Sequence, residues 1–359
     1  SEVERRSFPL LGLLPGGDFD AHAAAAIAST SVAEARRLVE DLVDANLLGQ
    51  HAPGRYHFHD LLRQYARTIA ARDTAEGDGD RATRQLVSYY LELGRAAERI
   101  ADPGRSTCAP DERATGLPAL RTATDVRAII AAEHRNVDAV TRLAVRHGLL
   151  DDAAQLSLVY GPLLLRQGYL DEALSGYETG IAAARALGSK ETEAALHRSA
   201  GLALIPARRL DAALRALHAS LRIEEELGNT PGAGRVYANI GIVHIRLGRF
   251  AEALTNLRHA LWLLREAGTR RDKAAALVNL GVAHIQLGDY AEAIENNKQV
   301  LVENEELGNP YIEATSLLNL GLAQGRSGDV REALRNLQRS RELSVRIGAT
   351  EMEARGLYV

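Results

Sequence analysis

Residues 279–293, NLGVAHIQLGDYAEA, decide the fold of this 359-residue chain. The same pattern stands 40 positions earlier, as NIGIVHIRLGRFAEA at residues 239–253. In each stretch a helix-forming segment ends at a glycine-containing turn, and an alanine-containing second segment follows. A pattern that returns at a fixed spacing predicts a repeat protein rather than one compact core.

Glycine and alanine recur in four columns with this 40-residue period. Small side chains inside the helices would let two helices cross with their backbones close together. A glycine after the second helix would supply a left-handed C-cap. One column is broken at Arg208, where the period calls for a glycine. The columns are Gly161, Gly201, Gly241, Gly281 and Gly321; Ala173, Ala213, Ala253, Ala293 and Ala333; Gly188, Gly228, Gly268, Gly308 and Gly348; and Gly168, Gly248, Gly288 and Gly328.

These stretches resemble tetratricopeptide repeats (TPRs) of the longer variety, with about 40 residues instead of the ~34 of the standard repeat. The resemblance covers residues 149–347, as five units. The second unit departs from the repeat pattern at Pro206. Because proline has no amide donor, the first helix of that unit is expected to end early. Residues 125–147 show the apolar spacing of an amphipathic helix, which is expected to cap the stack.

Residues 1–72 lack the period and indicate a different unit. Ser31 and Glu34 have the spacing of a capping box, which opens a helix. Three helices, a two-stranded wing and a final helix predict a winged-helix domain. The expected elements are a helix that ends at Pro15, helices over 20–28 and 31–46, strands over 47–51 and 56–58, and a helix over 59–71.

Charge argues against DNA binding by this unit. The helix in the recognition position, residues 31–46, carries Arg36 and Arg37 against four acidic residues. The whole chain has 43 basic and 47 acidic side chains and a net charge of −4. Because a helix that faces phosphates should be cationic, DNA contact is expected only through another part of a longer protein.

Residues 56–66, YHFHDLLRQYA, are similar to the His-Asp motif in the winged-helix domain of STAND ATPases of the NB-ARC type. Together with residues 11–16 (LGLLPG) and 35–43 (ARRLVEDLV), they resemble the large regulators of the Streptomyces antibiotic regulatory protein (SARP) family. The resemblance implies DNA-binding, activator and NB-ARC domains ahead of this region in a parent protein. It also implies that His59, with Asp60, senses the β-phosphate of ADP there. The alternative is that His59 only caps its helix and packs, with Asp60 as a first-turn acid.

The predicted fold class is therefore all-α, with a winged-helix domain followed by a right-handed TPR-type α-solenoid superhelix. The expected domains are the winged helix at 1–72, an acidic linker, helix and Pro-containing loop at 73–118, and the superhelix at 119–359. The chain starts at Ser1 without a methionine, and its period stops inside a first helix. We therefore expect it to be a piece of a larger protein.

The residues do not support catalysis by this chain. It has no P-loop pattern for an ATP phosphate, and its one cysteine, Cys108, has no histidine nearby in the sequence. His57 and His59 lack a third nearby metal ligand, and His244 and His284 are expected to pack in the core. We expect no enzyme, no metal and no cofactor here, whereas ADP or ATP is expected in the parent protein.

The candidate binding residues fall on the first helices, which line the groove of TPR superhelices. Asparagine amides carry donors and an acceptor, so a row of them can bind the backbone of an extended peptide. The alternative is that they connect adjacent repeats. Arginine and glutamine beside them could contact acidic side chains. The candidates are Asn239, Asn279, Asn319, Arg235, Arg246, Gln286 and Arg326.

The leading hypothesis is the sensor region of a SARP-type transcriptional activator of secondary metabolism. Its repeats would bind a protein, peptide or small effector, or the NB-ARC domain of the same protein, and shift a closed–open equilibrium. The alternatives are a stand-alone TPR adaptor that binds peptides and a fragment that binds DNA directly. No apolar run approaches the ~20 residues of a membrane span and no signal peptide opens the chain, so the cytoplasm is the expected location.

Overall fold

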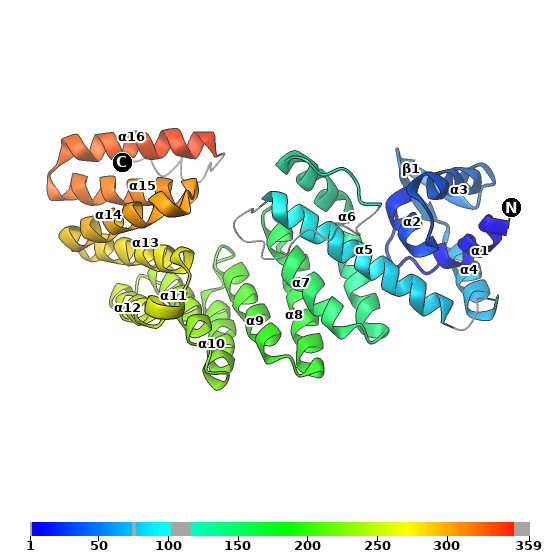
Figure 1. Ribbon diagram of the computed structural model, residues 1–359, viewed down its shortest axis with the longest axis horizontal. Coiled ribbons are helices and arrows are strands. Elements are labelled where there is room, and N and C mark those ends of the chain that lie inside the picture. Colours follow the sequence, from blue (N-terminus) through cyan, green and yellow to red (C-terminus); the bar gives the residue numbers. More distant parts are fainter. Residues whose placement is uncertain (1, 74–76, 102–115, 348–359) are drawn as a thin grey trace. The chain divides into compact units, whose positions relative to one another are not determined.

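The computed structural model describes residues 2–73, 77–101 and 116–347 (Figure 1). Cys108, most of the expected Pro-containing loop, part of the acidic linker and the expected truncated last helix lie outside the described residues. The described residues form sixteen α-helices and one two-stranded sheet, so the fold is all-helical apart from that hairpin. Within them, no helix combines the length and the apolar character that crossing a membrane requires.

The chain forms two compact units, Ser1–Ser199 and Ala200–Val359. The first unit joins the segment without repeats, the expected linker helix and the first repeats. The two units are defined by which residues contact one another in space. The expected boundaries at 72 and 118 were instead placed where the sequence pattern changes.

The first unit opens with six elements in the predicted order. Helix α3 begins at the predicted capping box, in which the Glu34 amide donates to Ser31 Oγ and the Ser31 amide donates to Glu34 Oε2 at 3.0 Å. The two strands are antiparallel, with Leu48 opposite Phe58, and Phe19 bridges to Tyr56 beside them. The elements are α1 (Glu2–Leu11), α2 (Ala21–Ala28), α3 (Val32–Asp44), β1 (Leu48–Ala52), β2 (Arg55–Phe58) and α4 (Asp60–Asp73).

Two long helices follow, α5 (Asp78–Ala101) and α6 (Ala123–Arg146). They pack against each other and both pack against α7 (Leu150–Leu165), while α5 also contacts α2. A Cβ at Gly94 would lie only 2.7 Å from Tyr160 Cε2, so this glycine lets α5 approach α7 closely. The helix expected within the linker is therefore an integral part of the first unit.

Ten helices follow as five pairs, as the period predicts. In each pair a glycine of the first helix faces a side chain of the second; a Cβ at Gly241 would lie 2.6 Å from Leu257 Cγ. The other facing pairs are Gly161–Tyr177, Gly201–Leu217, Gly281–Asn297 and Gly321–Leu337. The helices are α7 with α8 (Leu170–Leu187), α9 (Lys190–Leu204) with α10 (Leu210–Glu226), α11 (Thr230–Arg246) with α12 (Phe250–Ala267), α13 (Arg270–Leu287) with α14 (Tyr290–Leu307), and α15 (Pro310–Ser327) with α16 (Val330–Arg346).

The turn between the two helices of a pair needs a left-handed residue. Gly288, at φ 88°, takes this conformation after α13. Arg208 takes it in the second pair, at φ 58°, although it carries a side chain. Helix α9 ends at Leu204, two residues before Pro206, which confirms the expected early end.

The predicted left-handed C-cap is wrong at Gly268. Gly188, Gly228 and Gly308 have φ values of 75°, 64° and 59°, but Gly268 is extended, with φ −76° and ψ 147°. The chain leaves α12 in this extended conformation toward Thr269, the N-cap of α13. A Cβ at Gly268 would lie 2.6 Å from the Leu264 carbonyl oxygen. Glycine is therefore needed here because a side chain would not fit against α12, and not because the backbone is left-handed.

Candidate partner-binding site

The first helices of the second unit contact one another, because α11 packs on α13 and α13 packs on α15 (Figure 1). Residues at equivalent positions of the 40-residue repeat therefore lie on neighbouring helices of a single helix layer. Arg246, Gln286 and Arg326 share such a position near the helix ends, and all three are exposed. We call these three residues the polar column.

The predicted asparagine row is less accessible than the polar column. Asn239 and Asn279 are half-buried, and Asn279 Nδ2 donates to the carbonyl oxygen of Ala275 in its own helix at 2.8 Å. Asn319 is only 2% exposed, and its Nδ2 has no hydrogen-bond partner among the residues that the structure describes. The structure therefore places the three amides at the same position of the repeat but does not present them together to solvent.

Arg235 lies in an ion pair between repeats. Its Nη1 is 3.5 Å from Asp272 Oδ2, which connects α11 with α13. Arg235 thus links adjacent repeats, a role that the sequence indicated only for the asparagines. A partner that uses Arg235 would compete with Asp272 for its guanidinium group.

The two repeated histidines lie among packed side chains. Burial lowers the pKa of His244, and no described residue forms a hydrogen bond with its buried Nδ1. His284 is buried, and its Nδ1 lies 3.1 Å from Asp289 Oδ2 at the following turn. Nowhere in the part of the chain that the structure describes do three or more His, Cys, Asp or Glu residues gather as metal ligands.

The His-Asp motif stands at the exposed start of α4. His59 and Asp60 are both exposed, and the His59 ring lies edge-on to His57 with centroids 5.5 Å apart. Leu61 and Tyr65, on the same helix, are 82% and 60% exposed. Sequence reasoning missed these two apolar side chains, although their spacing of four places them on one helix face beside the motif.

Sequence reasoning also missed a pocket in the first unit. It lies between α4, α5, α6 and the segment after α1, and three arginines line it. No sequence motif marks it, because its residues come from separate parts of the chain.

The helices form pairs that recur every 40 residues, and in each pair a glycine of the first helix faces the second helix. This arrangement defines a helical repeat protein. The first helices of its second unit carry the exposed polar column. The family model "Tetratricopeptide repeat" matches residues 191–266 and 272–344, so the chain carries TPRs.

Among curated proteins, the chain is 40% identical over 106 residues to the regulatory protein AfsR of Streptomyces coelicolor. That match covers 28% of this chain and 11% of AfsR. The AfsR of Streptomyces griseus is 38% identical over 103 residues, again covering 28% of this chain and 11% of the relative. The chain thus matches about a ninth of the length of these regulators.

Among solved structures, the fold is similar to that of a STAND protein with a tetratricopeptide repeat sensor from Pyrococcus horikoshii. The TM-score is 0.50 at 14% identity, and the match covers 99% of this chain and 52% of that chain. A Rap protein complexed with Competence and Sporulation Factor also matches, with a TM-score of 0.50 at 11% identity over 93% of this chain and 92% of that one. At such identities the likeness shows a shared fold.

Proposed function

We propose that this chain is the sensor region of a SARP-type transcriptional regulator and that its repeats bind a protein or peptide partner. The observation that carries the proposal is the 40% identity to the regulatory protein AfsR in a chain that also carries TPRs. In the parent protein, residues 1–72 would form the winged helix of an NB-ARC ATPase that binds ADP or ATP. His59 and Asp60 would then face the nucleotide, and DNA would be bound by a separate N-terminal domain.

Partner binding would work by a population shift. A partner changes the closed–open equilibrium only if it binds one state better than the other. The polar column favours an acidic segment as the partner's contact, because two of its three exposed side chains are guanidinium groups. The Rap protein of the same fold, solved with Competence and Sporulation Factor, supports partner binding by such repeats.

Site-specific photo-crosslinking in the cell tests where the partner binds. Benzoylphenylalanine is placed at Gln286 or Arg326 of the full-length regulator, and at Gln299 as a matched control in the helix pair that contains Gln286. Gln299 is also exposed, but it lies on the second helix α14. We expect the same adduct from positions 286 and 326 and none from 299. Equal yields from all three positions, or no adduct at all, would contradict the proposal.

Transcription tests whether this surface has a regulatory role. The double variant Arg246→Ala/Arg326→Ala should change transcript levels of the genes that the regulator controls, because it removes two exposed cations from the polar column. Arg258→Ala is the control, an exposed arginine on the second helix α12. An unchanged transcript profile in the double variant, at normal protein level, would favour an adaptor without a regulatory role.

A further inference from the structure

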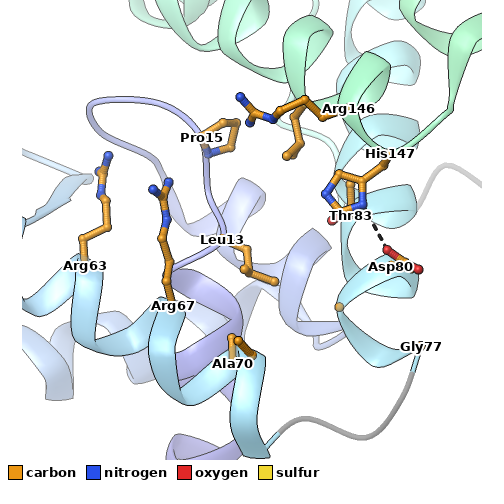
Figure 2. A pocket seen from close by; sticks show the side chains of 13 residues that line it. Leu13, Pro15, Arg63, Arg67, Ala70, Gly77, Asp80, Thr83, Arg146 and His147 are labelled. Carbon is orange, nitrogen blue, oxygen red and sulfur yellow. Dashed lines mark hydrogen bonds and ion pairs between the residues drawn. The ribbon is translucent and has the colours of Figure 1, made fainter.

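A pocket of about 770 Å³ lies in the first compact unit, between α4, α5, α6 and the segment that follows α1. Figure 2 shows Arg63 and Arg67 projecting from α4, and Arg146 reaching in from the end of α6. Arg63 and Arg67 are one helical turn apart, so they share a face of α4. Three cationic side chains from two helices thus converge on one hollow.

Among the described lining residues, carboxylates are too few to neutralise this charge. Among the described residues, Asp80 is the one carboxylate in the pocket lining, and its Oδ1 lies 3.0 Å from Nδ1 of His147. Arg146 makes no ion pair or hydrogen bond with any residue that the structure describes. Burial and the charge of Arg67 lower the pKa of Arg63. Like charges held together without enough carboxylates favour the binding of an anion.

A side chain that lines the pocket also has a buried hydrogen-bond donor without a partner among the described residues. Arg67 Nε donates to the Gly12 carbonyl oxygen at 2.9 Å, which fixes the direction of that side chain. Arg63 Nη2 makes a long contact of 3.4 Å with the Gly17 carbonyl oxygen, but Arg63 Nε is buried and has no partner in the described part of the chain. A buried donor without an acceptor costs about 1–3 kcal/mol, so an acceptor that enters the pocket would be favoured.

The lining also contains apolar side chains, among them Leu13, Pro15 and Leu143, and the hydroxyl-bearing Thr83. We propose that this pocket binds a phosphomonoester of a small organic molecule, with the phosphate at the three arginines and the organic group against these apolar side chains. A phosphomonoester carries about −1.5 to −2 charges at pH 7, which matches three guanidinium groups and one carboxylate. The guanidinium fork also fits phosphate oxygens in pairs. This site does not depend on the partner proposed for the repeats.

Calorimetric titration of the chain at low salt tests the proposal, with phenyl phosphate as the probe. Arg146→Gln should weaken its binding about tenfold, the loss expected for a charge-assisted hydrogen bond. The matched control is Arg135→Gln, which removes the same charge from an exposed position of α6 outside the pocket. Arg67→Gln should also weaken binding.

Two further probes distinguish the ligand chemistry. Benzoate offers a carboxylate on the same ring, and inorganic phosphate offers the anion alone; both should bind more weakly than phenyl phosphate. Absence of saturable phenyl phosphate binding at millimolar concentration, an equal effect of Arg146→Gln and Arg135→Gln, or tighter binding of either other probe would overturn the proposal. Arg146 is exposed and unpaired among the described residues, so Arg146→Gln should keep the melting temperature and remain a fair test.

Discussion

Arg208 holds a backbone conformation that glycine holds at the matching turns. Its φ is 58°, whereas Gly168, Gly248, Gly288 and Gly328 stand at 84°, 73°, 88° and 97°. A side chain in the left-handed region costs about 1 kcal/mol, because Cβ crowds the following carbonyl oxygen. The break in the glycine column was visible in the sequence, but the sequence did not reveal that the turn would keep its shape and absorb this strain.

Arg208→Gly should therefore stabilise the chain slightly, by up to about 0.5 kcal/mol once the greater freedom of unfolded glycine is subtracted. Urea denaturation followed by circular dichroism measures the change. Gly248→Ala is the reverse control: a Cβ there meets nothing within 4 Å, so its cost comes from the backbone alone. A loss of stability in Arg208→Gly would show that its side chain contributes more than the strain costs.

Asn297 is the exception among the side chains that face the glycine column. It is fully buried; its Nδ2 donates to the Ala293 carbonyl oxygen at 2.8 Å, and its Oδ1 has no partner within the described ranges. Three of the other four positions in this column hold leucine. Asn297→Leu should raise the free energy of unfolding by about 1–2 kcal/mol, since it removes an unsatisfied buried acceptor. Thermal and urea denaturation check this, and a lower stability would mean that the Oδ1 has a partner in solution.

Asp18 contributes a pH dependence. Burial alone would raise its pKa, but the hydrogen bonds and charge of Arg55 outweigh burial and hold the pKa below its ordinary value. A lowered pKa stabilises the fold above about pH 3.9, and this contribution is lost as the pH falls through the lowered value. Asp18→Asn should therefore lose less stability than wild type between about pH 5 and pH 3. Urea denaturation at several pH values measures both slopes, and parallel slopes would contradict the expectation.

At the scale of helices, the period predicted much of what the structure contains. Five helix pairs could be predicted because the two helices of a pair cross at a glycine. This glycine recurs in every repeat of the sequence. The role of α5 could not be predicted, because its packing on α7 through Gly94 depends on a helix more than 50 residues away. Gly268 was mistaken for a C-cap because close packing and left-handed φ both select glycine.

Replacing a glycine inside a helix by alanine should destabilise the chain where another helix packs against the glycine and stabilise it where the glycine faces open space. Gly241→Ala should destabilise the chain by about 1–3 kcal/mol, because its Cβ would overlap Leu257. Gly176, inside α8, has open space where a Cβ would stand, so Gly176→Ala should stabilise by about 0.5–1 kcal/mol. Denaturation of both variants in urea measures the signs. Equal effects would mean that close helix crossing does not explain the column.

At the scale of the whole molecule, sites differ in how far the sequence can predict them. The polar column was predictable because its three residues repeat with the helices. The arginine pocket was not, because Arg63 and Arg146 are 83 positions apart and only the packing of α4, α5 and α6 brings them together. Polar contacts over such spans also hold the first unit together. Arg55 of the hairpin pairs with Glu133 of α6, and Tyr90 of α5 donates to the same carboxylate at 2.6 Å.

Breaking this buried network should show how far along the chain a local loss of stability extends. Glu133→Ala would leave Arg55, Tyr90 and Asn136 without their shared acceptor, and loss of one partner of a buried pair costs about 3–5 kcal/mol. Because each repeat contacts mainly its neighbours, the effect should stay in the first unit. Hydrogen exchange should show faster exchange in α5 and α6, with α13 to α16 unchanged. Comparable acceleration in α15 and α16 would mean that the repeats unfold as one cooperative block.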